Sequence, residues 1–373
     1  MTFLGLVSDG VFCQDFGDLT VRFVGQETSV KFTVSDADGN QLSSFEEIYY
    51  PNADDEIIIA GLSDVISSYL EGEKLSTLFN PNQGCTEISS FVTLKIEFYQ
   101  SGNKVDACSQ VFYQSLDRTR VYPVNYNYFL SRFRKRKVYE DQAIMLSYIY
   151  RGQTLKANVA YYDANSASCR RTITLDNSHV KAGRTALHQY LPSDIAAQCS
   201  VTQASLIYVE FSLIMDGKVI DYMKCTFDHG HLRQRTSFLF KNLFGVPEVL
   251  VLTGEDKLTS EMEGAFAWIG RKYKKVSTEL TAYHTISTGY IDRDTFSSVE
   301  DAIRSDEVHI VDGASIKDMA TVTSIDYSDK TPNDSPREAF VTYRISNKAQ
   351  EMFSRVGVKA GEIFDDTFDE TFE

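Results

Sequence analysis

Basic side chains gather between residues 132 and 137, the densest basic stretch in a chain of 373 residues whose net charge is −15. Arg132, Arg134, Lys135, Arg136 and Lys137 can pair with carboxylates, and guanidinium groups do so through two parallel hydrogen bonds. Two interpretations stay open. The cluster is either a solvated loop, as most charge runs are, or a docking site for an acidic partner.

The last thirteen residues, 361–373, are acidic, with six carboxylates and no base. Phe364, Phe368 and Phe372 recur at four-residue spacing, which on a helix places the three rings on one stripe. Such a helix can lie in a groove of a partner, whereas an unstructured acidic tail is the alternative. We hypothesise a subunit contact in which this segment docks on the basic cluster of a neighbouring copy.

Two other stretches carry residue types that bind metals. Residues 36–40 and Glu47 place acids in a register that resembles an EF-hand loop, but Gln41 stands where that loop needs glycine. We therefore favour an ordinary hairpin turn there. Residues 228–231 (Asp-His-Gly-His) have no further ligand cluster nearby and fit a polar linker between domains. We expect no metal and no cofactor.

Sequence motifs for catalysis are absent: the chain contains no phosphate-binding loop, dinucleotide fingerprint, nucleophile elbow or zinc-protease motif. We expect no catalytic residues and no enzymatic activity. A dense aromatic run, Tyr122, Tyr126, Tyr128 and Phe129, would suit a binding loop, but we favour a core or interface strand.

The acidic composition, with a pI of about 4.9, argues against nucleic-acid and anionic-membrane partners because phosphates would be repelled. No apolar run is long enough for membrane insertion, and we expect no signal peptide. The six widely spaced cysteines fit buried thiols in a reducing compartment.

The chain repeats itself. Residues 92–114 reappear in looser form at 205–229, a period of roughly 115 residues, which is the size of a whole domain. We expect a first β-sandwich-like domain over 1–116, a second over 117–231, a third unit over 232–360 and the acidic tail over 361–373.

Alternating apolar residues predict a mainly β fold with sandwich-like repeats, each with one short helix, over 62–70 in the first. Turns at 101–103 and 215–217 predict a hairpin in each repeat. In the third unit we expect two strands over 238–254, a helix starting near Ser260 and a second helix over 294–304. The strand pattern of 273–285 offers a strand as the alternative to the helix near Ser260.

Three stretches of the third unit carry a resemblance to a known family. They are FLFKNLFGVPEVLVLTGED (238–256), STGYIDRD (287–294) and AIRSDEVHIVDG (302–313). Together with 49–70 and 321–327 they resemble tail structural proteins of bacteriophages that infect Bacteroides-type bacteria. The resemblance implies a distal-tail or hub component whose third unit is tail-tube-like, a β domain with a flanking helix that closes into a ring. It implies turn and packing roles for Asn242, Phe244, Gly245, Glu248, Thr288 and Gly289, while Leu243 departs from the pattern.

We therefore expect a structural protein of the virion tail, made in the cytoplasm of the bacterial host, whose partners are other tail proteins and copies of itself. The alternative is an adhesion module that binds a receptor or glycan on the host surface. A third class, a sugar-active enzyme, would need two carboxylates about 5–9.5 Å apart in a cleft.

Overall fold

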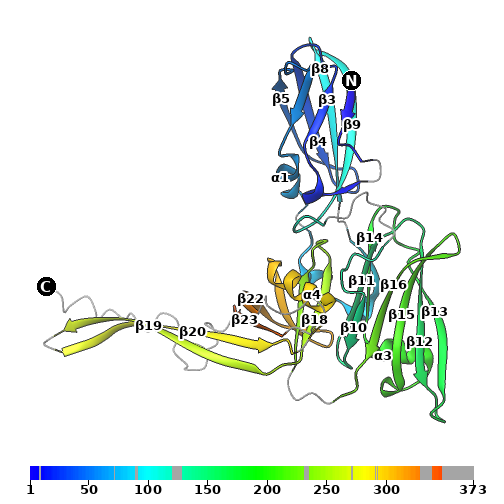
Figure 1. Cartoon of the computed structure of the whole chain (residues 1–373), viewed down its shortest axis with the longest axis vertical. Coiled ribbons are helices and arrows are strands. Elements are labelled where there is room, and N and C mark those ends of the chain that lie inside the picture. The colour runs from blue at the N-terminus through cyan, green and yellow to red at the C-terminus, as the bar shows by residue number, and fades with distance from the viewer. Residues whose placement is uncertain are drawn as a thin grey trace.

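The structure is a computed structural model that describes the chain apart from residues 8–9, 71, 89–90, 120–127, 231–234, 270–271, 290, 292, 328–337 and 347–373. The expected mainly β fold is confirmed, and Figure 1 shows three β units in chain order. Within the described residues no helix is both long and apolar enough to cross a membrane. All six cysteines are free thiols.

The first unit is a sandwich of two sheets. The five-stranded sheet has the order β2-β9-β8-β4-β5 and the three-stranded sheet the order β1-β3-β6. Their apolar faces enclose one core, and the alternation that predicted these strands reflects one inward and one outward face. The elements are β1 (Thr2–Leu4), β2 (Val11–Phe12), β3 (Leu19–Arg22), β4 (Thr28–Ser35), β5 (Gln41–Tyr49), β6 (Glu56–Ile59), α1 (Leu62–Ser67), β8 (Phe91–Gln100) and β9 (Asn103–Tyr113).

The second unit repeats this topology. Its five-stranded sheet has the order β10-β16-β15-β12-β13, which matches the first sheet strand for strand, including a parallel pairing at one edge. The hairpins β8–β9 and β15–β16 coincide with the repeated sequence. The elements are β10 (Lys135–Val138), β11 (Ile144–Ile149), β12 (Thr154–Tyr162), β13 (Ser168–Leu175), β14 (Thr185–Tyr190), α3 (Pro192–Cys199), β15 (Leu206–Met215) and β16 (Lys218–Phe227).

One strand crosses between the two sandwiches. β7 (Gly84–Ile88) lies in the first repeat of the sequence, after the short helix α2 (Leu75–Leu78), yet it pairs with β14 of the second unit. The smaller sheet of the second sandwich therefore has the order β11-β14-β7. The first repeat thus completes the sheet of the second.

The third unit is a seven-stranded sheet, β18-β17-β21-β22-β23-β20-β19, with α4 packed against it. The helix expected over 294–304 is confirmed as α4, but the helix expected near Ser260 is wrong, because that stretch is the strand β19. Its partner strand continues the alternation of 273–285. The elements are β17 (Thr236–Lys241), β18 (Pro247–Leu252), β19 (Asp256–Ile269), β20 (Lys272–Ser287), α4 (Arg293–Arg304), β21 (Val308–Asp312), β22 (Ser315–Tyr327) and β23 (Ala339–Ile345).

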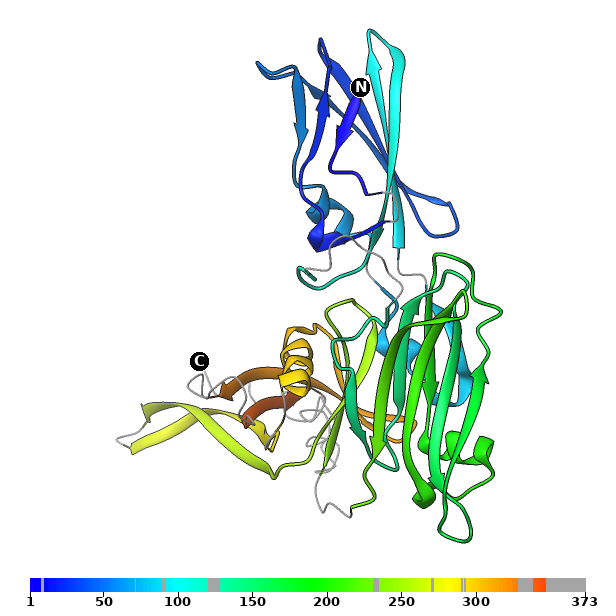
Figure 2. The ribbon, with the colours of Figure 1, turned by 45° about the vertical axis from the view of Figure 1, so that its right-hand side comes forward.

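Strands β19 and β20 form a ribbon that leaves the body of the molecule, as Figures 1 and 2 both show. β20 pairs with β23 only from His284 to Ser287, whereas it pairs with β19 along nearly its whole length. From Thr259 to Tyr283 the ribbon therefore consists of two of the described strands, with no third one paired to them. At about 3.3 Å per residue, this free part is roughly 35 Å long.

Candidate functional site

The basic cluster lies at the start of the second sandwich and is divided by strand alternation. On β10, Lys135 and Lys137 are exposed, whereas Arg136 and Val138 are buried. Successive residues of a strand point to opposite faces, so one short segment presents two cations to solvent and directs another inward. The cluster is therefore neither a uniform loop nor a uniform patch.

Arg136 joins the second sandwich to the third unit. Its Nη2 atom lies 2.8 Å from Oε1 of Glu248 on β18, and both side chains are buried. Glu248 also accepts hydrogen bonds from Ser131 and from the Nδ2 atom of Asn242, at 2.8 and 2.7 Å. A buried ion pair needs such additional hydrogen bonds, because desolvation otherwise exceeds the Coulomb gain.

The other two arginines of the cluster also have partners within the chain. Arg132 forms an ion pair with Asp301 on α4, and Arg134 contacts Asp221 on β16 at 2.6 Å. Burial raises the pKa of Asp301 to about 6 in spite of the arginine beside it. The structure thus places four of the five predicted basic contact residues in ion pairs within the chain: the three arginines and the exposed Lys137, whose Nζ atom lies 3.8 Å from Oδ2 of Asp228. Their role in a subunit contact stays a prediction, and it now depends on Lys135 and Lys137.

Both lysines border a cavity of about 420 Å³ between the second sandwich and the third unit. Its wall includes the hydroxyl residues Thr226, Thr253 and Thr288. The acidic segment predicted to bind here, with Phe364, Phe368 and Phe372, lies outside the described residues.

The stretch that resembles a calcium loop is the turn between β4 and β5. Asp36 Oδ1 accepts hydrogen bonds from the backbone N–H groups of Asp38 and Asn40, and its Oδ2 accepts one from the side-chain amide of Asn40. The bond from the Asn40 side chain, together with those from the backbone, lowers the pKa of Asp36. Asp38 contacts Arg184 of the second sandwich at 2.6 Å. Among the described residues no three His, Cys, Asp or Glu side chains are placed to hold a metal ion. The antiparallel pairing of β4 with β5 around this turn confirms the favoured hairpin, which also touches the second sandwich.

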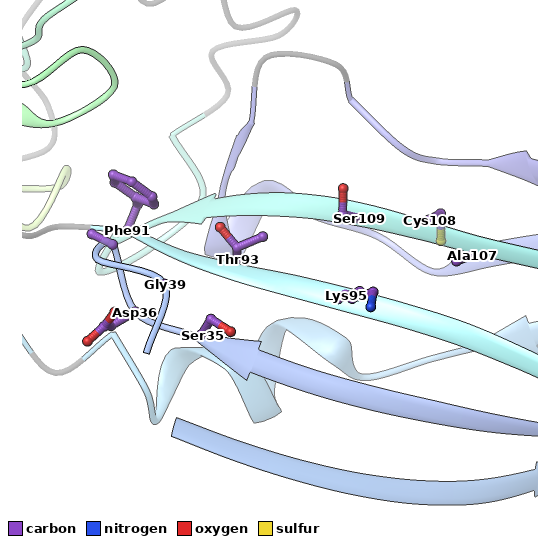
Figure 3. A pocket seen from close by; sticks show the side chains of 10 residues that line it. Ser35, Asp36, Gly39, Phe91, Thr93, Lys95, Ala107, Cys108 and Ser109 are labelled. Atoms are coloured by element: carbon purple, nitrogen blue, oxygen red, sulfur yellow. The ribbon is translucent and has the colours of Figure 1, made fainter. Parts of the chain in front are cut away.

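The shallow hollow in Figure 3 lies next to this turn, on the outer face of the five-stranded sheet of the first sandwich. It measures about 520 Å³, and its walls include Thr93, Lys95 and Ser109. Lys95 lies 2.8 Å from Glu97, so its charge is already partnered. The hollow is open and its lining mixes polar and apolar groups, which suits a weak contact better than catalysis.

A buried histidine in the second sandwich was missed by sequence reasoning. His188 Nε2 lies 3.4 Å from Cys85 Sγ and 3.2 Å from the hydroxyl of Tyr148, and its Nδ1 lies 3.0 Å from the hydroxyl of Tyr190. Burial lowers the pKa of His188 to about 3 and raises that of Cys85 to about 12. A neutral imidazole beside a thiol that stays protonated is unsuited to nucleophilic chemistry. The network instead fixes β7 to β14.

Exposed aromatic side chains lie at the free end of the first sandwich, in loops that sequence reasoning did not single out. Phe23 and Tyr50 are 72% and 70% exposed. Phe23 adopts a φ of 62°, and the neighbouring Val24 N–H donates to the carbonyl of Asp55. A bulky residue in the left-handed region costs free energy and is often retained for function. Of the predicted aromatic run, Tyr128 is exposed, Phe129 is buried beside Tyr148, and Tyr122 and Tyr126 lie outside the described residues.

No protein-family model and no curated protein matches this chain. Among solved structures, the periplasmic chaperone SfaE aligns with 59% of this chain and 96% of its own length, at 6% identity and a TM-score of 0.18. A tetra-tandem repeat from the extending region of a large adhesion protein aligns with 87% of this chain and 75% of its own, at 14% identity and a TM-score of 0.18. Scores this low carry no argument about fold or function.

Proposed function

We propose that this chain is a non-enzymatic structural protein of a phage tail or tail-like assembly, which forms or decorates a ring through its third unit. Its partners would be copies of itself and other tail proteins, in a virion made in the host cytoplasm. The observation that carries the proposal is the ribbon of β19 and β20, which leaves the body of the protein with no third described strand beside its outer part.

A two-stranded ribbon is at best marginally stable in water, because it buries little apolar surface. Leu258, near the start of the ribbon, is 57% exposed. Contact with a neighbouring subunit would bury such residues and pair the free edge of β19. Symmetric rings supply such a neighbour to every copy. The resemblance of the third unit to phage tail proteins points in the same direction.

The test is light scattering coupled to size exclusion, with a shortened ribbon as the variant. Thr259 and Tyr283 are paired in register, so residues 260–282 can be replaced by a two-residue Asn-Gly turn that closes a shorter hairpin. We expect the full chain to form a discrete oligomer and the shortened chain to stay at the monomer mass of 42.1 kDa less the deleted part. An oligomer that survives the deletion would contradict the role of the ribbon.

A second candidate function, receptor or glycan binding at the tail tip, is supported by Phe23 and Tyr50. Loops at one end of a sandwich that present aromatic side chains are a common way to bind sugars and proteins. We expect the labelled full chain to bind host cells, and the double variant F23A/Y50A to lose that binding while keeping its oligomeric state. Equal binding by both proteins would remove this candidate.

A further inference from the structure

The smaller sheets of the two sandwiches differ at the edge formed by β6 in the first and by β14 in the second. In the second, β7 lies beside β14, with a ladder from Thr185 opposite Ile88 to Gln189 opposite Gly84. β6 has the place of β14 in the first sandwich, but no described strand pairs with its other side. An unpaired edge exposes backbone N–H and C=O groups that can accept another strand.

Side chains near this edge are also more exposed in the first sandwich than in the second. Val30 pairs with Glu47 on β5, as Leu155 pairs with Leu175 on β13. Leu175 is buried, whereas Glu47 is exposed. The equivalent position is therefore buried in the second sandwich, which has received β7, and exposed to solvent in the first, which has not. Ile58 of β6 is also 52% exposed.

Charge distinguishes this open side from the rest of the chain. Residues 1–113 hold 17 acids and 5 bases. Glu46, Glu47 and Asp54, on β5 and the loop before β6, are exposed. A strand that paired with β6 would lie in a negative field, and a basic strand would be attracted.

The ribbon supplies a basic strand. Residues 264–278 contain Arg271, Lys272, Lys274 and Lys275 and no acid, a second basic run that sequence reasoning passed over. β20 carries Lys272, Lys274 and Lys275. It pairs with β23 only from His284 to Ser287, so over Lys272–Tyr283 its edge away from β19 has no partner among the described strands. In Figures 1 and 2 the ribbon extends to the side of the body while the first sandwich of its own chain stands above it, so a contact between them needs a second copy.

We propose that the basic ribbon of one copy lies beside β6 of a second copy and adds β20, through its edge over Lys272–Tyr283, to the open edge of the first sandwich. The inference rests on the self-assembly proposed above and names its interface. The contact is head-to-tail: each copy contributes its ribbon to one neighbour and accepts the ribbon of another at its β6 edge. Repetition of this contact closes a ring or extends a filament.

Two charge-reversed full chains test the contact by light scattering. The first, K272E/K274E/K275E, has an acidic ribbon, and the second, E46K/E47K/D54K, has a basic edge. Each alone brings like charges together, and we expect each to stay at the 42.1 kDa monomer mass. Mixing the two in equal amounts restores opposite charges at every contact, so we expect even-numbered oligomers to return. A chain with all six substitutions should assemble by itself.

The outcomes separate the contact from the proposed function. If the unmodified chain forms an oligomer that neither reversal weakens, self-assembly stands and the ribbon contact is wrong. If deletion of 361–373 abolishes assembly while both reversals leave it intact, the contact between copies is made by the acidic tail and not by the ribbon. A monomer at every concentration of the unmodified chain overturns both ideas. Thermal unfolding of each variant, together with recovery on mixing, shows that a lost oligomer is not a misfolded chain.

Discussion

The first and second sandwiches share one strand order but use their smaller sheet differently. In the second, every residue of β11 and β14 is buried, because the third unit and the segment around Leu75 cover the outer face. In the first, β3 and β6 alternate between buried and accessible residues, since that face is open. The same fold thus serves once as an internal joint and once as a free surface.

The sandwich cores differ as well. β6 directs Ile57 and Ile59 into an apolar core, whereas β14 directs His188 into the buried polar network. The first sandwich therefore depends on apolar packing, and the second adds hydrogen bonds that only a neutral histidine can make. Four measurements would sharpen or break this contrast.

The largest effect is expected at the joint. Arg136→Ala leaves the Glu248 carboxylate buried without its partner, which costs about 3–5 kcal/mol. Urea unfolding should show the loss in the second and third units, while the first sandwich keeps its stability. Lys135→Ala, on the same strand but exposed, is the matched control and should change stability by less than about 0.5 kcal/mol. Equal effects of the two variants would mean that the pair contributes nothing.

Next is a comparison of two outward-facing residues on equivalent strands. Leu187 on β14 is fully buried in one apolar cluster with Leu239 and Val249 of the third unit, so Leu187→Ala should cost about 2–5 kcal/mol. Ile58 on β6 is exposed, and Ile58→Ala should cost less than about 0.5 kcal/mol in the monomer. Both values follow from denaturant midpoints. A large loss for Ile58→Ala in a monomer would show that the first sandwich is covered after all.

Acid should separate the two cores. The pKa of His188 is near 3 in the folded state and about 6.5 in the unfolded state, so the unfolded chain binds more protons between these values. The second sandwich therefore loses stability as pH falls through this window. Hydrogen exchange followed peptide by peptide should show β14 opening more readily at pH 4.5 than at pH 7, values chosen on either side of about 6.5. His188→Gln should remove most of that pH dependence, and if the variant keeps it another group is responsible.

The smallest effect concerns the strained loop. Phe23→Gly places a glycine at a φ of 62°, which relieves strain and should stabilise the first sandwich by up to about 1 kcal/mol. Tyr50→Gly is the control, because the φ of Tyr50 is not positive and glycine therefore relieves no backbone strain at this position. Thermal unfolding measures both. A loss of stability in Phe23→Gly would mean that the ring packs usefully in spite of its exposure.

Local features of the fold were predictable from sequence, and long-range ones were not. The two repeated hairpins followed from alternating strands around turn residues, and Gly102 and Gly217 do have positive φ. The pairing of β7 could not be foreseen, because its partner strand lies about a hundred residues further along the chain. The stretch near Ser260 read as a helix because its apolar residues fit both periods, and pairing with β20 decides for a strand.

The candidate site shows the same division. Residue types identified the basic cluster, but only the inward position of Arg136 on β10 revealed that one of its charges is buried against Glu248. No spacing in sequence marks that direction, because Glu248 belongs to another unit. The second basic run, on the ribbon, was visible in the sequence. Only the structure shows that it lies on a projecting two-stranded hairpin, where it can contact another copy.

The shared strand has a consequence for synthesis. When the ribosome has made the first sandwich, β7 already exists, but β14 is still about a hundred residues away. At roughly 5–20 residues per second, β7 waits on the order of 5–20 seconds before its partner emerges. The growing chain therefore carries an unfinished edge during translation, and a fragment that starts at residue 117 would lack a strand it cannot make for itself.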